Sequence, residues 1–353
     1  MKKSLKRLSV LAVTPAAGLI LGLAVTGSTV ASAATVHSTA TVPQVKPSVA
    51  TTRPVYAAAP ATATPAAATC KPNEAFRFLA CGRTPFTDTF YVDNKVVGRI
   101  TFLLQQTDQL AVKSTAVTES DEIYDIKVSG EVLPTAVATA ATCGANCTGS
   151  AHGSVALVPG ATYRFDLHFS NSVGAGAVHF NAPAYRWVFS SGGEVTGGGL
   201  QWRCDDKLNE HAGCVYPIFH PTITSLAGLK FIAASIKRIQ ARGGPKELHR
   251  NSFLTTANRN AVCNIKLPPG WKPPAGWPLP ITDPKNKPTC DEYPFAASWE
   301  GGKRLPASQR GTAWVPASEN SSQGGLLNAF YLQNRVLDAT SAKTKGDAFN
   351  VGV

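Results

Sequence analysis

The segment TYRFDLHF, residues 162–169, decides the fold class of the first half of the chain. Its apolar residues alternate with Arg164, Asp166 and His168, and a period of two is typical of a β-strand with one buried face. We expect these three polar residues on the solvated outer face of a sheet. Similar runs, separated by Gly, Asn, Asp and Ser, occupy residues 89–92, 96–104, 122–128, 154–158 and 184–189. Short strands at this spacing predict an antiparallel sandwich or barrel.

The apolar pattern changes its period near residue 221. Leucine and isoleucine then recur at steps of three and four as far as Ile239, which predicts an amphipathic helix within residues 221–242. Gly243 and Gly244 are expected to end this helix. Its exposed face is basic and carries Lys230, Lys237, Arg238 and Arg242. The expected fold class is α+β, with an N-terminal β-sandwich-like module followed by a small α/β domain.

The N-terminus has the three parts of a secretory signal peptide. A basic start (MKKSLKR) precedes an apolar run to about residue 25, and the small residues at 31–33 predict cleavage before Ala34. A membrane anchor is the competing interpretation. However, Pro15 and several glycines interrupt the run, and no later stretch approaches the roughly 20 apolar residues needed to cross a bilayer. We therefore expect a secreted, extracellular protein with no membrane span after cleavage.

The segment after the signal peptide is poor in large apolar side chains. Residues 34–69 are almost wholly Ala, Thr, Val, Pro and Ser, a composition typical of a flexible spacer. The expected organisation is therefore a signal peptide at 1–33, a disordered Ala/Thr/Pro linker at 34–69, a β-rich module of unknown role at 70–203 and a second domain at 204–353.

All eight cysteines lie after the signal peptide. An even number in an exported chain predicts disulfides, and the absence of any C-x-x-C spacing argues against a zinc site. Pairing of sequence neighbours is the simplest arrangement. Other connectivities stay open, because spacing alone does not choose among them.

Positive charge is concentrated in the last part of the chain. Residues 70–203 carry 10 basic and 11 acidic side chains, whereas residues 204–353 carry 18 basic and 11 acidic ones, in a protein of net charge +12. A basic domain beside a neutral one favours a polyanionic partner, such as nucleic acid, an envelope polymer or a membrane surface. Ordinary solubility is the alternative explanation.

Three carboxylates crowd one short segment of this basic domain. The sequence CDEYPFAASWEGG, residues 290–302, contains Asp291, Glu292 and Glu300. Adjacent acids repel each other unless a cation neutralises them, and a divalent metal with oxygen ligands would do so. Such a metal would suit phosphodiester cleavage. The residues alone equally allow Asp291 and Glu292 to cap the N-terminus of a helix.

The same segment resembles the NucA/NucB family of secreted bacterial deoxyribonucleases. The similarity rests on Asp291-Glu292-Tyr293-Pro294, Glu300 and Gly301-Gly302, and it extends over residues 216–353. Further matching motifs are Leu248-His249-Arg250, Asn258-Arg259, Trp314-Val315-Pro316, Ser318-Glu319-Asn320, Gln323-Gly324-Gly325, Asn334-Arg335 and Gly346-Asp347-Ala348-Phe349. The resemblance implies a small α/β nuclease domain that cuts extracellular DNA with a divalent metal, Mg²⁺ or Mn²⁺, and little sequence selectivity. It says nothing about the β-rich module.

The resemblance also suggests roles for individual residues, each with an alternative. The expected catalytic residues are Asp291, Glu292, Glu300 and His249, the last as a general base or as an ordinary structural histidine. The expected metal ligands are Asp291, Glu300 and Asn320, although Asn320 would also suit a turn. The expected substrate-binding residues are Arg250, Arg259, Asn320, Gln323 and Arg335. Arg259 and Arg335 would alternatively be ion-pair partners of the acids. A disulfide from Cys263 to Cys290 would tie the acid segment to the preceding loop.

Two functions from different classes follow. The first is a secreted, metal-dependent endonuclease that hydrolyses DNA, with the β-rich module binding an envelope ligand or placing the enzyme. The alternative is a non-enzymatic envelope or polyanion-binding protein with a degenerate nuclease domain. Removing the Asp291 carboxylate separates them, because only an enzyme has turnover to lose.

Overall fold

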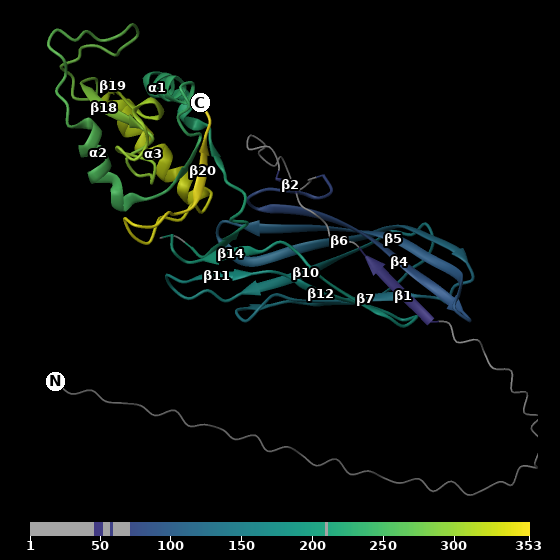
Figure 1. Ribbon diagram of the computed structural model, residues 1–353. Helices are drawn as coiled ribbons and strands as arrows, with labels where there is room; N and C mark the ends of the chain where they lie inside the picture. Colours follow the sequence, from purple (N-terminus) through teal and green to yellow (C-terminus); the bar gives the residue numbers. More distant parts are fainter. Residues whose placement is uncertain (1–45, 52–56, 59–70, 209–210) are drawn as a thin grey trace, which may run out of the picture. The chain divides into compact units, whose positions relative to one another are not determined.

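A computed structural model describes residues 46–51, 57–58, 71–208 and 211–353 (Figure 1). The expected signal peptide, its cleavage point and most of the expected linker lie outside these residues. Part of that linker nevertheless forms strand β1 (Lys46–Thr51), which pairs antiparallel with β4 (Leu79–Val92). The pairing is explained by backbone hydrogen bonding to β4 and by Val49, which packs against the module's core. Among the described residues, no helix is long and apolar enough to cross a membrane.

The largest sheet is built on three long antiparallel strands, β4, β5 (Lys95–Ala111) and β6 (Ser114–Gly130). Strand β10 (Tyr163–Asn171) continues it beyond β6, and residues alternate between buried and exposed along β10, as the period of two predicts. Arg164, Asp166 and His168 are exposed. The sheet is completed by β2 (Ala57–Ala58), β3 (Glu74–Ala75) and β8 (Cys147–Thr148).

A second sheet covers the buried face of the first. Its strand order is β13 (Glu194–Gly198), β12 (Ala184–Phe189), β7 (Ala136–Thr142) and β9 (Ala151–Ala156). Phe86 of the first sheet meets Trp187 of the second edge to face, at a centroid distance of 5.2 Å. The two sheets therefore share one hydrophobic core. All six segments predicted as strands overlap strands of these two sheets.

A third sheet extends the module beyond the expected domain boundary. Strand β14 (Trp202–Asp205) lies between β11 (Val178–Asn181) and β15 (Gly213–Val215). Cys204, Cys214 and Tyr216 belong to the first core, whereas the second core begins at Ile223. The expected boundary between residues 203 and 204 therefore falls inside this sheet, and the structural change comes near residue 217.

The C-terminal domain contains every α-helix of the described residues (Figure 1). Helix α1 (Lys230–Gln240) buries Ile232, Ile236 and Ile239, and the turn after it places Gly243 at a φ of 88°, as the helix prediction requires. The other helices are α2 (Thr255–Cys263) and α3 (Ala317–Gln333), with 3₁₀ turns at Ser225–Gly228, Ser252–Leu254 and Ala307–Gln309. The helices pack on two small sheets. The first has the strand order β16 (Thr222–Ile223), β20 (Ala348–Val351) and β17 (Glu247–His249). The second is the pair of β18 (Pro288–Tyr293) and β19 (Gly311–Pro316).

Within the described residues, three disulfides each join two consecutive cysteines of the chain. They are Cys143–Cys147, Cys204–Cys214 and Cys263–Cys290. The simplest pairing is confirmed for these six residues, while Cys70 lies outside the described residues. The third bond ties the end of α2 to β18, across 27 positions of sequence.

Candidate active site

The two adjacent acids lie in the middle of strand β18. Asp291 pairs with Ala313 and Glu292 with Thr312 of β19, so neither acid caps a helix. The capping alternative is thereby excluded. Both side chains are nearly enclosed, with Asp291 3% exposed and Glu292 5% exposed. A charged carboxylate in such a place needs a compensating partner.

Asp291 has only partial compensation. Its pKa is raised to about 7, first by burial and second by the charge of Glu292, against opposing effects of Gln323 and Arg259. Its Oδ2 atom is buried and accepts no hydrogen bond of ordinary geometry from the described residues, although the Gln323 amide lies close enough to lower the pKa. An orphaned, buried carboxylate oxygen suits a bound cation.

Glu292 is paired with a cation from α2. Nε and Nη2 of Arg259 each lie 3.4 Å from Glu292 Oε1. Burial raises the pKa of Glu292, and the charge of Arg259 opposes that rise. The disulfide Cys263–Cys290 links the end of α2 to the residue before Asp291, so the position of Arg259 relative to the acids is held covalently. Arg259 thus matches its ion-pair alternative, and its side chain, 53% exposed, also remains accessible to a substrate.

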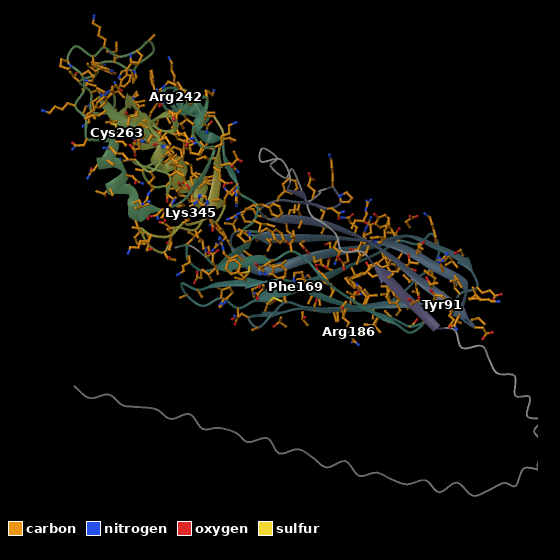
Figure 2. All side chains as sticks on the ribbon, in the orientation of Figure 1. Tyr91, Phe169, Arg186, Arg242, Cys263 and Lys345 are labelled. Carbon is orange, nitrogen blue, oxygen red and sulfur yellow. A yellow bond between two sulfur atoms is a disulfide. The ribbon has the colours of Figure 1, made fainter. Side chains whose placement is uncertain are left out.

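Glu300 and His249 form a second pair. The main-chain N–H of His249 donates to Glu300 Oε2 at 2.9 Å, and its Nδ1 lies 2.8 Å from Glu300 Oε1. A carboxylate at Nδ1 favours the tautomer with its proton on Nδ1, which leaves Nε2 free to accept a proton. Both oxygens of Glu300 are engaged with His249, so Glu300 holds the imidazole in this structure. Figure 2 labels Lys345 in this domain, and its Nζ lies 4.0 Å from Glu300 Oε1.

A cavity of 260 Å³ gathers five of the predicted residues. They are Arg250, Arg259, Glu292, Asn320 and Gln323. Arg250 is held there by a hydrogen bond to Val336 O at 2.7 Å and by the ring of Tyr331, 4.4 Å from its guanidinium carbon. Two guanidinium groups on one cavity wall suit a phosphate.

Helix α3 connects the cavity to the acid strand. Asn320 Nδ2 donates to Cys290 O at 3.1 Å and to Thr289 Oγ1 at 3.2 Å, so Asn320 anchors α3 on β18 from inside a helix and does not form a turn. Its neighbour Glu319 accepts hydrogen bonds from Phe231 N and Ile232 N and so caps the start of α1. The Ser-Glu-Asn motif therefore fixes two contacts around the site.

One structural residue was missed by the sequence analysis. Asn258 Nδ2 donates to Ala296 O at 2.8 Å and Ser298 O at 2.9 Å, and its side chain packs against Gly301 and Gly302. A Cβ at Gly301 would lie 2.6 Å from the Asn258 side chain, which explains the glycine. The Asn258-Arg259 motif predicts substrate binding or ion pairing for Arg259 and no function for Asn258. Asn258 shapes the loop that carries Glu300.

Arg335 does not join the site, contrary to expectation. It is 1% exposed, lies at a φ of 46°, and forms an ion pair with Asp205. Its guanidinium also donates to Val112 O and His211 O. A buried arginine whose donors are used in this way is a structural residue, so substrate binding by Arg335 is not supported. Its ion-pair partner is also not one of the predicted acids.

The described residues fit the expected metal site only in part. Among the described residues, no group of three or more His, Cys, Asp or Glu is placed to hold an ion. A magnesium ion, however, is commonly held by one or two carboxylates and keeps several waters. The free oxygen of Asp291 fits that requirement, and the expected metal roles of Glu300 and Asn320 stay predictions.

A comparison with known proteins places one family on this region. Residues 272–351 match the model of the deoxyribonuclease NucA/NucB family, which confirms the resemblance for the C-terminal domain. The match includes Asp291, Glu292, Glu300, Asn320 and Gln323, whereas His249, Arg250 and Arg259 precede it. No curated protein and no solved structure matches the chain.

Proposed function

We propose that the C-terminal domain is an endonuclease that hydrolyses phosphodiester bonds of extracellular DNA with a divalent metal, Mg²⁺ or Mn²⁺, and little sequence selectivity. The observation that carries this proposal is the unpartnered Asp291 oxygen, next to Glu292 and Gln323 of a cavity walled by two arginines. The matching family supports the same reaction class. The apolar N-terminus supports export of the protein, and the β-rich module would then bind an envelope ligand.

Each residue has a task in this proposal. Arg250 and Arg259 bind the non-bridging oxygens of the scissile phosphate and neutralise the charge that grows there as water attacks. His249 precedes Arg250 in the chain but does not line the cavity itself. In this proposal its Nε2 accepts the proton of the attacking water, and Glu300 stabilises the resulting imidazolium through Nδ1. The water oxygen forms the new bond to phosphorus, and the bond from phosphorus to one deoxyribose oxygen breaks. That oxygen takes a proton from solvent water and becomes the hydroxyl end, while the other fragment keeps the phosphate.

Asp291 would hold the metal, with Glu292 as the second nearby carboxylate. When bound, a divalent metal supplies Lewis-acid stabilisation of the phosphorane and activates water. Asn320 contributes by keeping α3 against β18, close to Asp291. The Nε2 atom of Gln323 is buried, makes no hydrogen bond of ordinary geometry within the described residues and lies close enough to Asp291 to lower its pKa. That donor suits a phosphate oxygen.

The decisive experiment is plasmid cleavage by the oxidised protein without residues 1–33. It compares the parent with Mg²⁺ or Mn²⁺, the parent with EDTA, and Asp291→Asn. Asp166→Asn is the matched control, because it makes the same change on the exposed face of β10. We expect cleavage by the parent and Asp166→Asn only, with DNA binding kept by Asp291→Asn. A folded parent that binds DNA and never nicks it would reject the enzyme and favour the polyanion-binding protein.

A further inference from the structure

A second cavity of 280 Å³ also has Glu292 in its lining. Glu292 lines both cavities, so the two are immediate neighbours. Both cavities also use α2, the first through Arg259 and the second through its last turn. The second cavity alone is lined by Lys303, by Arg310 and by Thr312 at the start of β19.

Cations converge on the β19 wall of this cavity. Lys303 and Arg310 line it directly. Helix α1 and the turn after it add two more, because Arg238 Nη2 donates to Thr312 O at 3.3 Å and Arg242 Nη2 donates to Arg310 O at 3.4 Å. The basic face of the predicted helix is therefore directed to a particular place, and is not simply a solvated surface.

These cations are not consumed by carboxylates. Within the described ranges, no ion pair involves Lys303, Arg310, Arg238 or Arg242, whereas the single acid of the cavity, Glu292, is paired with Arg259. A cluster of unpaired cations repels itself and attracts a polyanion. Pairing of Glu292 also means that no uncompensated negative charge separates the two cavities.

We infer that this second cavity binds a DNA backbone phosphate next to the one that is cleaved, so that the strand crosses Glu292 from one cavity to the other. Lys303 lines the cavity, and Arg242 lies beside it through its hydrogen bond to Arg310 O, so these two side chains provide the charge. Arg310 is positioned by its own hydrogen bond to Leu305 O at 2.9 Å. Such a phosphate subsite recognises the polymer and not the base. The inference rests on the proposed function for the identity of the first cavity, but its ligand class follows from the cations themselves.

The test uses Lys303→Gln combined with Arg242→Gln. The matched control is Lys95→Gln combined with Arg99→Gln, which removes the same charge from exposed residues of β5. DNA affinity is measured against salt concentration by fluorescence anisotropy, with all proteins in the Asp291→Asn background. Loss of one or two phosphate contacts should lower the slope of log affinity against log salt by about 1 to 2, equally for different sequences. The control should keep the slope of its parent.

A second arm uses proteins with Asp291 intact. Cleavage of a long duplex should weaken more than cleavage of a dinucleotide, since a dinucleotide has no neighbouring phosphate to bind. An unchanged salt slope, or equal losses on both substrates, would overturn the subsite. If the parent cleaves DNA and the slope is unchanged, only the subsite fails. If no protein cleaves but the slope depends on Lys303 and Arg242, the nuclease fails and the subsite stands.

Discussion

The chain contains two groups of buried acids, and they differ in what surrounds them. In the β-rich module, Asp108, Glu119 and Asp121 lie inside the core. In the C-terminal domain, Asp291 and Glu292 are almost as enclosed, yet Glu292 lines two cavities and is paired with Arg259. Burial alone therefore does not make a catalytic site. An accessible space and nearby cations distinguish the second group from the first.

The acids of the module are surrounded by neutral partners. Asp108 faces Glu119 across β5 and β6, and Tyr216 donates to Asp108 at 2.9 Å. Gln106 and Tyr185 donate to Glu119. Burial raises the pKa values of Glu119 and Asp121 to about 8 and that of Asp108 well above its ordinary range, and the mutual charges of the three acids act in the same direction. The charge of Asp166 also raises the pKa of Asp121. The folded module therefore favours the protonated forms of these acids.

The largest loss of activity is expected for substitutions at His249 and its partner Glu300. His249→Gln should lower kcat by roughly 10²–10⁴-fold, the range typical of a lost general base, without unfolding the domain. Glu300→Gln should lower it by about 10–100-fold and alter the pH profile, because Glu300 acts through His249. Plasmid nicking rates across pH provide the measurement. If both variants had the kcat and the pH profile of the parent, His249 would be a structural residue and not the general base.

The next effect is a pH dependence of the stability of the protein, caused by the buried acids of the module. Their pKa values are higher in the folded protein than in the unfolded chain, so the folded state binds more protons between about pH 4 and pH 8. Stability should fall as pH rises through that window, by roughly 1.4 kcal/mol per pH unit for each retained proton, and level off above it. Thermal unfolding across this window, followed by circular dichroism, measures the slope.

The double variant Glu119→Gln with Asp121→Asn is the test of that assignment. It removes two ionisations and should flatten the pH dependence while leaving DNA cleavage intact. A dependence as steep as that of the parent would mean that other groups dominate, and would weaken the contrast between the two acid groups.

The smallest effect is expected on the outer face of the module. Arg164 pairs with Glu122 at 2.9 Å, but the side chain of Arg164 is 77% exposed. Arg164→Gln should change the free energy of unfolding by less than about 1 kcal/mol and leave cleavage unaltered, because solvent screens such pairs. Urea denaturation is the measurement. A larger loss would show that this face does more than contact water.

Periodicity explains which parts of the fold were predictable. Alternation in residues 162–169 identified a strand, and steps of three and four identified α1, because each pattern directly reflects one buried face. The acid group of the module was missed for the same reason. In TESDEIY, residues 118–124, polar residues occupy both faces of β6, so alternation does not reveal that Glu119 and Asp121 point inward.

Sequence motifs predicted the part of the candidate site whose residues belong to short local segments. Asp291, Glu292, Asn320 and Gln323 come together as the motif suggested. Arg335 was misplaced, because its partner Asp205 lies 130 positions away and sequence spacing says nothing about such a contact. The same limit applies to Glu300, whose engagement with His249 spans 51 positions.

The disulfide between Cys263 and Cys290 limits the cell compartments in which the domain can assemble fully. In a reducing cytosol these residues would be two thiols, and the long segment between them would lose its closure. The helix with Arg259 and the strand with Asp291 would then be joined by packing alone. A chain that is exported would acquire this covalent tie only after leaving the compartment that holds the cell's own chromosome, so oxidation would separate synthesis from full assembly in both time and place.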